Sequence, residues 1–270
     1  MSAYITIEHG LLLLGCGKMG SALLKGWLDF GVPAGSVWVI EPRPSDWLQS
    51  TGVHLNKGVP DRAGIAILAV KPQMMGAALP GLTALGNGPT LFISIAAGTT
   101  IQTLEQVLGA QTPIVRVMPN TPAMVGRGIS GLVGNAHASA SQLAQARLLM
   151  QAVGEVVELE NEAQIDAVTA VSGSGPAYVF HLIEALAAAG EAEGLSPDIA
   201  MKLARATVTG SGELAHRSTD SAEQLRVNVT SPGGTTAAAL AVLMERETGF
   251  PALLKRAVKA AADRGRELGK

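Results

Sequence analysis

The sequence predicts an α/β protein in which a doubly wound parallel sheet is followed by an all-helical second domain. The first half of the chain alternates short apolar runs with helical stretches, a pattern typical of βαβ units with right-handed crossovers. The second half lacks strand patterns, and four of its expected helices carry a proline in the first turn, where the missing N–H costs nothing. The 270 residues are enough for two such domains.

The expected strands are short apolar runs that suit burial within a parallel sheet. They are Leu11–Leu14, Val37–Ile40, Ile65–Val70, Leu91–Ile95, Ile114–Met118, Gly131–Val133 and Val153–Leu159. Between the first two lies Ser21–Phe30, whose apolar residues recur at helical spacing. Strand patterns stop after Glu160, so we expect a first domain of residues 1–160 and a second of residues 161–270.

The second domain is expected to form a dimer. Its predicted helices are Pro176–Gly194, Pro197–His216, Ala222–Asn228, Pro232–Glu245 and Pro251–Leu268. They are rich in alanine, and aromatic residues make up only 3% of the chain. Because small side chains bury little area, association between subunits is expected to complete the core. We predict an obligate dimer at least.

Charge, cysteine content and hydropathy argue against several classes of protein. The net charge of −2 provides no basic field for nucleic acid or anionic membranes. The apolar runs are too short to span a bilayer, and residues 1–10 lack the blocks of a signal peptide. One cysteine, and five histidines without metal-ligand spacing, argue against a disulfide and against a metal site. We expect a cytoplasmic protein without nucleic-acid or membrane partners.

A glycine motif follows the first expected strand. Gly15, Gly17 and Gly20 stand between that strand and a helix, as in the GxGxxG motif of Rossmann domains. In that context the first glycine permits a tight turn, the second lets a pyrophosphate approach the backbone, and the third allows close packing. The helix N-terminus then faces the phosphates. A merely glycine-rich turn is the alternative, and Cys16 is interpreted as a small filler.

The second strand ends in two conflicting cues for the dinucleotide. Glu41 stands where an acid accepts the ribose 2′-hydroxyl of NAD, whereas Arg43 is placed to pair with the 2′-phosphate of NADP. A solvated Glu-Pro-Arg-Pro turn is a third interpretation. These residues leave the choice of cofactor open.

Later strand ends carry further polar and small residues at the edge where open α/β sheets bind ligands. Lys71 follows one strand, and Ser94–Gly98 supplies small residues suited to a flat ring. Arg116–Pro122 ends in a rigid turn that presents the amide of Asn120. Each of these is more often structural when alone, but together they favour a cofactor site.

The sequence resembles the pyrroline-5-carboxylate reductases, from about Leu11 to the C-terminus. The first half carries AVKPQ at Ala69–Gln73, SIAAG at Ser94–Gly98 and RVMPNTPA at Arg116–Ala123. The second half carries DAVTAVSGSGPAY at Asp166–Tyr178 and LRVNVTSPGGTT at Leu225–Thr236, a pair specific to this family. The family reduces the C=N bond of 1-pyrroline-5-carboxylate with NADPH, or with NADH, to give L-proline.

The resemblance implies interlocked dimers with a site formed between subunits, and it assigns residues. The expected cofactor contacts, together with the positions argued above, are Leu14, Gly15, Cys16, Gly17, Lys18, Met19, Gly20, Glu41, Arg43, Asn56, Ala69, Val70, Lys71, Pro72, Ile95, Ala96, Ala97, Gly98 and Asn120. The expected substrate contacts are Glu162, Asn228, Gly233, Gly234, Thr235 and Thr236. The family usually prefers NADPH, and Glu41 departs from that preference.

The substrate that the resemblance implies is a cyclic imine with a carboxylate. Thr230–Thr236 is expected to begin a helix with a cap, a proline and two glycines, whose backbone N–H groups attract a carboxylate. An ordinary helix cap is the alternative. Thr236 is the catalytic candidate: its hydroxyl is expected to orient or relay a proton at the ring nitrogen, not to supply one. Ser172–Pro176 is expected to interrupt a helix, for close approach to the nicotinamide or for packing alone.

Two other classes of protein share parts of this pattern. The β-hydroxyacid dehydrogenases also join a Rossmann domain to a helical one, but they use a lysine on a long helix. The segment Pro176–Ala192 contains no lysine, which argues against that class. A non-catalytic cofactor sensor would keep Gly15–Gly20 but would have no need of the SPGGTT segment.

Overall fold

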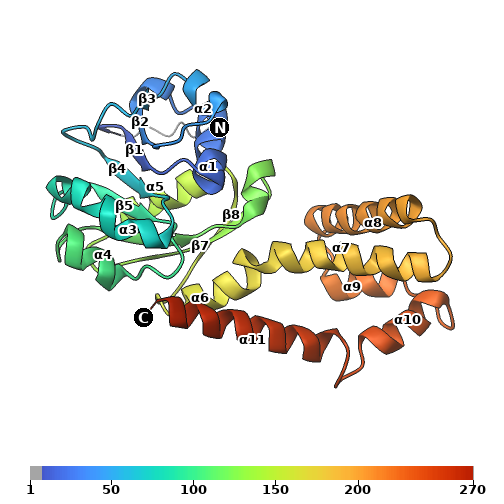
Figure 1. The fold of residues 1–270 in the computed structure, drawn as a ribbon. Helices are drawn as coiled ribbons and strands as arrows, with labels where there is room; N and C mark the ends of the chain where they lie inside the picture. The colour runs from blue at the N-terminus through green and yellow to red at the C-terminus, as the bar shows by residue number, and fades with distance from the viewer. Residues whose placement is uncertain (1–7, 270) are drawn as a thin grey trace. The chain divides into compact units, whose positions relative to one another are not determined.

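The computed structural model describes residues 8–269 and is shown in Figure 1. It comprises two compact units. The first contains the described residues up to Gly173 together with the end of the last helix from Ala261, and the second is Ser174–Ala260. Within the described residues, no helix has the length and apolar character needed to cross a membrane.

An eight-stranded sheet in the order β3-β2-β1-β4-β5-β6-β7-β8 forms the first unit, as described for residues 8–269. The strands are β1 (Leu11–Leu14), β2 (Val37–Ile40), β3 (His54–Leu55), β4 (Ile65–Leu68), β5 (Leu91–Ser94), β6 (Ile114–Met118), β7 (Gly128–Gly134) and β8 (Gly154–Glu158). The predicted fold class and every predicted strand are confirmed. Strand β3, of two residues, was not predicted.

One strand pair departs from the predicted parallel arrangement. Strands β6 and β7 are antiparallel, whereas all other neighbours in the sheet are parallel. The connection between them is the 3₁₀ turn η3 (Thr121–Val125), closed by Gly126 in the left-handed region at φ +69°. A parallel crossover needs about a dozen residues or more, so this short turn reverses the chain.

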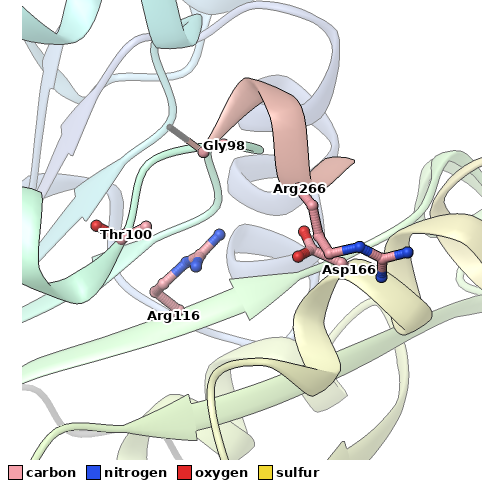
Figure 2. A pocket seen from close by; sticks show the side chains of 6 residues that line it. Gly98, Thr100, Arg116, Asp166 and Arg266 are labelled. Carbon is pink, nitrogen blue, oxygen red and sulfur yellow. The ribbon is translucent and has the colours of Figure 1, made fainter. Parts of the chain in front are cut away.

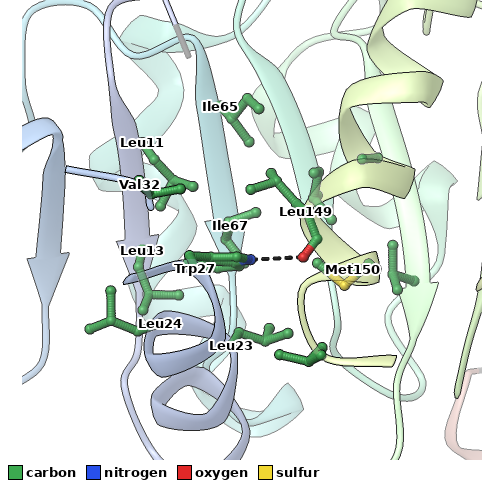
Figure 3. Close-up of a cluster of buried hydrophobic side chains, with 14 of the residues drawn as sticks. Leu11, Leu13, Leu23, Leu24, Trp27, Val32, Ile65, Ile67, Leu149 and Met150 are labelled. Atoms are coloured by element: carbon green, nitrogen blue, oxygen red, sulfur yellow. Dashed lines mark hydrogen bonds between the residues drawn. The ribbon is translucent and has the colours of Figure 1, made fainter. Parts of the chain in front are cut away.

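Helices cover both faces of the sheet. Successive side chains of β1 enter opposite apolar clusters: Leu11 and Leu13 lie in one, Leu12 and Leu14 in the other. The first cluster packs on α1 (Lys18–Asp29) and α5 (Ala140–Gln151), and the second on α3 (Pro72–Ala78), the 3₁₀ helix η2 (Leu79–Leu85) and α4 (Ile101–Leu108). Figure 3 shows the Trp27 indole N–H donating to the Leu149 carbonyl at 2.9 Å, which ties α1 to α5.

Shorter helical segments complete the first unit. They are η1 (Ala34–Ser36), α2 (Asp46–Ser50), α6 (Gln164–Val168) and a π-helical turn (Thr169–Gly173). The π turn overlaps the predicted helix interruption at Ser172 and Gly173, and it directly precedes Ser174, where the second unit starts. π turns are frequent at functional sites.

The second unit is helical, as predicted. It contains α7 (Gly175–Ala192), α8 (Pro197–Arg217), α9 (Ala222–Asn228), α10 (Thr235–Leu243) and the first part of α11 (Phe250–Leu268). The prediction that a helix begins at Pro232 is wrong. Gly233 has φ +69° and Gly234 is the N-cap, so the left-handed turn delays the start of α10 to Thr235.

Candidate active site

The carboxyl ends of β1, β4 and β5 lie level at one edge of the sheet, and β6 continues past this level to Met118. The parallel register pairs Leu14 with Leu68, Leu68 with Ser94, and Ser94 with Arg116. The segments that follow β4 and β5 are held to this edge, because Ala69 N–H donates to the Leu14 carbonyl at 2.8 Å and Ile95 N–H to the Leu68 carbonyl at 3.1 Å. The structure therefore brings the predicted cofactor residues of these strand ends together.

The glycine loop fits a dinucleotide pyrophosphate. Gly15 has φ +89°, and a Cβ on it would lie 2.9 Å from the Val70 backbone nitrogen. A Cβ on Gly20 would lie 2.5 Å from the Gly15 carbonyl oxygen, so α1 packs closely on the turn. A Cβ on Gly17, in contrast, would meet no described atom within 4 Å. Gly17 is the N-cap of α1 without a side-chain cap, which leaves space and backbone donors for an anion.

Glu41 is fixed against this loop. Its Oε2 accepts the Cys16 N–H at 2.8 Å, and its Oε1 accepts the Arg43 N–H at 3.0 Å. Asn56, at φ +52°, braces the same strand end, because its Oδ1 accepts the Glu41 N–H and its Nδ2 donates to the Glu41 carbonyl, both at 2.9 Å. The Arg43 side chain is exposed.

The Cys16 thiol is buried in the loop and hydrogen-bonds at 3.5 Å with the Ser21 hydroxyl. Burial raises the pKa of this thiol, and the nearby negative charge of Glu41 raises it further, although the Ser21 contact opposes them. A neutral, buried thiol is a poor nucleophile. The interpretation of Cys16 as a filler fits this environment.

The connection between β5 and α4 carries the predicted cofactor contacts Ile95–Gly98. Gly98 is at φ +72°, and a Cβ there would lie 3.0 Å from the Leu268 carbonyl oxygen at the end of α11.

The predicted residues after β4 and β6 are also placed by local contacts. Lys71, exposed after β4, is the N-cap of α3, with Pro72 at the start of that helix. Asn120 is buried, and its Oδ1 accepts the Ile129 N–H at 2.9 Å, which fixes the orientation of the side-chain amide.

A partly buried ion pair lies beside these residues, and the sequence did not predict that its two partners pair. Arg116 Nη1 lies 2.6 Å from Glu162 Oε1, and the same oxygen accepts the Ile101 N–H at 2.7 Å. Figure 2 shows Arg116 beside a cavity of about 240 Å³ lined by Gly98, Thr100, Arg116, Asp166, Arg266 and Gly269. An arginine inside the apolar run of β6 was the available signal, because a charge at a buried strand position requires a partner.

The remaining predicted residues belong to the second unit. Asn228 ends α9, where its Oδ1 accepts from Gln224 at 2.7 Å and its Nδ2 donates to Asp220 at 3.4 Å. Thr235 and Thr236 are the first residues of α10. The Gly234 N–H is used by the Ser231 carbonyl at 3.0 Å, and α10 has no side-chain cap, so its first-turn N–H groups are available to an anion.

The second unit also exposes many large apolar side chains. Its buried apolar cluster consists of Ala187, Ala200 and Ala204, packed against Ile183. The exposed apolar side chains include Val179, Phe180, Leu182, Leu186, Leu195, Ile199, Met201, Leu203, Leu214, Val242 and Leu254. Exposed apolar surface on this scale marks an interaction surface. Within residues 8–269, no group of three or more His, Cys, Asp or Glu side chains is arranged to hold a metal ion.

Two family models match the chain. The model described as pyrroline-5-carboxylate reductase dimerisation matches residues 162–268, and the model described as NADP oxidoreductase coenzyme F420-dependent matches residues 11–98. The pyrroline-5-carboxylate reductase of Pseudomonas aeruginosa is 42% identical over 264 residues, which cover 96% of each chain. That of Synechocystis is 41% identical over 273 residues, covering 98% of this chain and 100% of the relative.

Solved structures are also similar to this chain over nearly its whole length. The pyrroline-5-carboxylate reductase from Coxiella burnetii has a TM-score of 0.89 and 35% identity, covering 97% of this chain and 99% of that one. The pyrroline carboxylate reductase from Plasmodium falciparum, solved with NADP bound, has a TM-score of 0.83 and 31% identity, covering 99% and 100%. The similarity therefore spans both halves of the chain.

Proposed function

We propose that in this chain, which belongs to the pyrroline-5-carboxylate reductase family, the first unit binds the cofactor and the second unit binds the cyclic imine that is reduced. The protein is an NAD(P)H-dependent oxidoreductase that acts on the C=N bond of 1-pyrroline-5-carboxylate in proline biosynthesis, and it uses NADPH. The observation that carries the proposal is the loop Gly15–Gly20, closely packed at its ends and open at Gly17. The bound nicotinamide supplies the hydride.

The first unit holds the cofactor in this proposal. The N–H groups at the start of α1 bind the pyrophosphate, Glu41 lies at the adenosine ribose, and Ile95–Gly98 support the nicotinamide. The Asn120 side chain already accepts the Ile129 N–H through Oδ1, so its Nδ2 is oriented as a donor at the same edge of the sheet.

The second unit binds the substrate through the start of α10. The open first-turn N–H groups near Thr235 and Thr236 favour the substrate carboxylate, because a helix N-terminus carries partial positive charge. The Thr236 hydroxyl orients the ring nitrogen as it changes from imine to amine. Threonine is too weak an acid to be the proton source, so Thr236 positions or relays a proton that the solvent or the iminium form of the substrate provides.

The cofactor preference depends on Glu41. Its carboxylate is fixed by two backbone N–H groups, so it cannot turn freely away from a 2′-phosphate. Arg43 follows on the exposed turn and partly screens this charge. We propose that both NADPH and NADH serve as reductants.

The exposed apolar side chains of α7 and α8, within the part matched by the dimerisation model, support self-association as a dimer or a higher oligomer of dimers. The single cysteine suits a cytoplasmic location.

One experiment tests the proposal as a whole. The purified protein is mixed with NADPH and 1-pyrroline-5-carboxylate, and cofactor oxidation and proline formation are followed together. Equal amounts of both products are expected. Cofactor binding without oxidation would instead support the cofactor-sensor alternative.

A further inference from the structure

The Arg116–Glu162 ion pair fixes one end of the connection that carries the nicotinamide contacts. Arg116 lies on β6 with 5% of its surface exposed, and Glu162 lies between β8 and α6. Their closest atoms, Nη1 and Oε1, are 2.6 Å apart. Glu162 Oε1 also accepts the N–H of Ile101 at 2.7 Å, and Ile101 is the first residue of α4. A contact between residues 61 positions apart thus fixes the point where the connection enters the helix.

The other end of the connection is fixed by the sheet. Ile95 N–H donates to the Leu68 carbonyl at 3.1 Å, which continues the β4–β5 ladder. At the α4 end, the Thr100 side chain accepts the Thr103 N–H at 3.1 Å, so two N–H groups of the first turn are satisfied by Thr100 and Glu162. Residues 96–99 lie between these anchors, and Gly98 adopts φ +72° there. Their position depends on both anchors.

We infer that Arg116 and Glu162 are positioning residues for the nicotinamide end of the cofactor. Arg116 holds the Glu162 carboxylate, and Glu162 holds the Ile101 N–H and with it the segment 95–100. Family resemblance implies a substrate contact for Glu162, but Oε1 here is occupied by two partners of its own chain. The inference rests on the proposed role of Ile95–Gly98 as cofactor contacts.

Burial and charge give the pair its rigidity. The Arg116 side chain is 7% exposed and that of Glu162 32%, so solvent screens their attraction only partly. The carboxylate also lies at the N-terminus of α4, where negative charge is favoured. A small displacement of a reacting group can reduce the rate about 100-fold, so an anchor outside the reacting atoms is sufficient to matter.

The protein itself provides a matched control. Arg147 and Glu158 also form an ion pair in the first unit, but each side chain is 46% exposed. Variants Glu162→Ala, Glu162→Gln and Arg147→Ala are compared with the unaltered protein by steady-state kinetics, NADPH titration and hydrogen exchange of the peptide covering residues 95–101. The glutamine variant keeps an acceptor for the Ile101 N–H, and it remains informative where the alanine variant fails to fold.

For Glu162→Ala we expect about tenfold faster exchange of residues 95–101, a kcat about 10- to 100-fold lower, and a smaller change in the Kd of NADPH. Glu162→Gln keeps the acceptor but not the charge, so it is expected to restore part of the protection and of kcat, and Arg147→Ala to change neither. Exchange that stays normal in Glu162→Ala while the KM for the imine rises would overturn the inference in favour of a substrate contact. Normal exchange with a lost kcat in Glu162→Gln would overturn it as well.

The proposed cofactor site is checked separately in the unaltered protein. NADPH is expected to slow hydrogen exchange of residues 95–98 there. If NADPH supports turnover but leaves this exchange unchanged, the proposed contacts of Ile95–Gly98 fail, and the positioning inference fails with them. If the unaltered protein turns over with NADPH and NADPH slows exchange of residues 95–98, a negative result with the Glu162 variants contradicts only the positioning role of Arg116 and Glu162.

Discussion

The two compact units bury their side chains differently. In the first unit, Trp27, Phe92 and the leucines of β1 are almost fully buried between the sheet and its helices. In the second unit, the buried cluster consists of three alanines, while side chains as large as Phe180 and Leu203 are 61% and 53% exposed. The first unit completes its core within one chain. The second leaves its largest apolar side chains for a partner, which agrees with the match of residues 162–268 to a dimerisation family.

The largest expected effect comes from a substitution in the core of the first unit. Trp27→Ala removes a fully buried indole and its hydrogen bond to the Leu149 carbonyl. Replacing a buried tryptophan with alanine lowers the free energy of unfolding by about 3–5 kcal/mol. Denaturant unfolding measures this, and Trp47→Ala, at a side chain that is 37% exposed, is the matched control. Equal losses in both variants would contradict the assignment of Trp27 to the core.

The next effect concerns chemistry in the second unit. Thr236→Val keeps the branched shape and removes only the hydroxyl, so folding and NADPH affinity should survive. Loss of a preorganised polar contact lowers kcat about 10²–10³-fold, or by about 3–4 kcal/mol of transition-state stabilisation. Thr236→Ser should retain much of the activity. The exposed Thr207→Val on α8 is the control. A valine variant with near-normal kcat would show that Thr236 only begins a helix.

A third prediction compares how exposed apolar side chains of the two units contribute to self-association. Phe180→Ser on α7 is expected to weaken self-association, because burying such a side chain contributes about 1.5–3 kcal/mol. Val157→Ser, at a 44% exposed position of the first unit, should leave association unchanged. Dissociation constants from sedimentation equilibrium compare the two variants. Equal effects would show that the apolar surface of the second unit has no special role.

The smallest expected effect is a change of cofactor preference when Glu41 is replaced. Glu41→Ser removes the charge beside the ribose site, and the ratio of kcat/KM for NADPH to that for NADH should rise about 5- to 10-fold, on the order of 1 kcal/mol. Asp46→Ser, at an exposed acid just beyond the turn, should leave the ratio unchanged. An unchanged ratio in the Glu41 variant would mean that this carboxylate does not face the ribose.

The sequence was most informative where pattern and local chemistry agree. The apolar runs predicted the strands because a buried parallel strand needs apolar residues on both faces, and the glycine spacing predicted the loop after β1. Strand β3 was missed because two residues carry no periodicity. The antiparallel β7 and the late start of α10 depend on left-handed turns at Gly126 and Gly233, which apolar patterns do not report.

The candidate site was only partly predictable, because its supporting contacts are long-range. Asn56 was expected at the cofactor, but its bracing of Glu41 depends on a residue 15 positions away. The link from Arg116 through Glu162 to Ile101 joins three separate segments of the chain. A single sequence shows a charged residue within an apolar strand, but it does not show which carboxylate pairs with it.

The central claim, that the second unit is completed by self-association whereas the first is complete in itself, is tested most directly by light scattering and activity measured on the same samples across a dilution series. We predict a dimer or larger oligomer throughout the micromolar range, with loss of activity on dilution only where the oligomer dissociates. A stable and fully active monomer at micromolar concentration would contradict the claim.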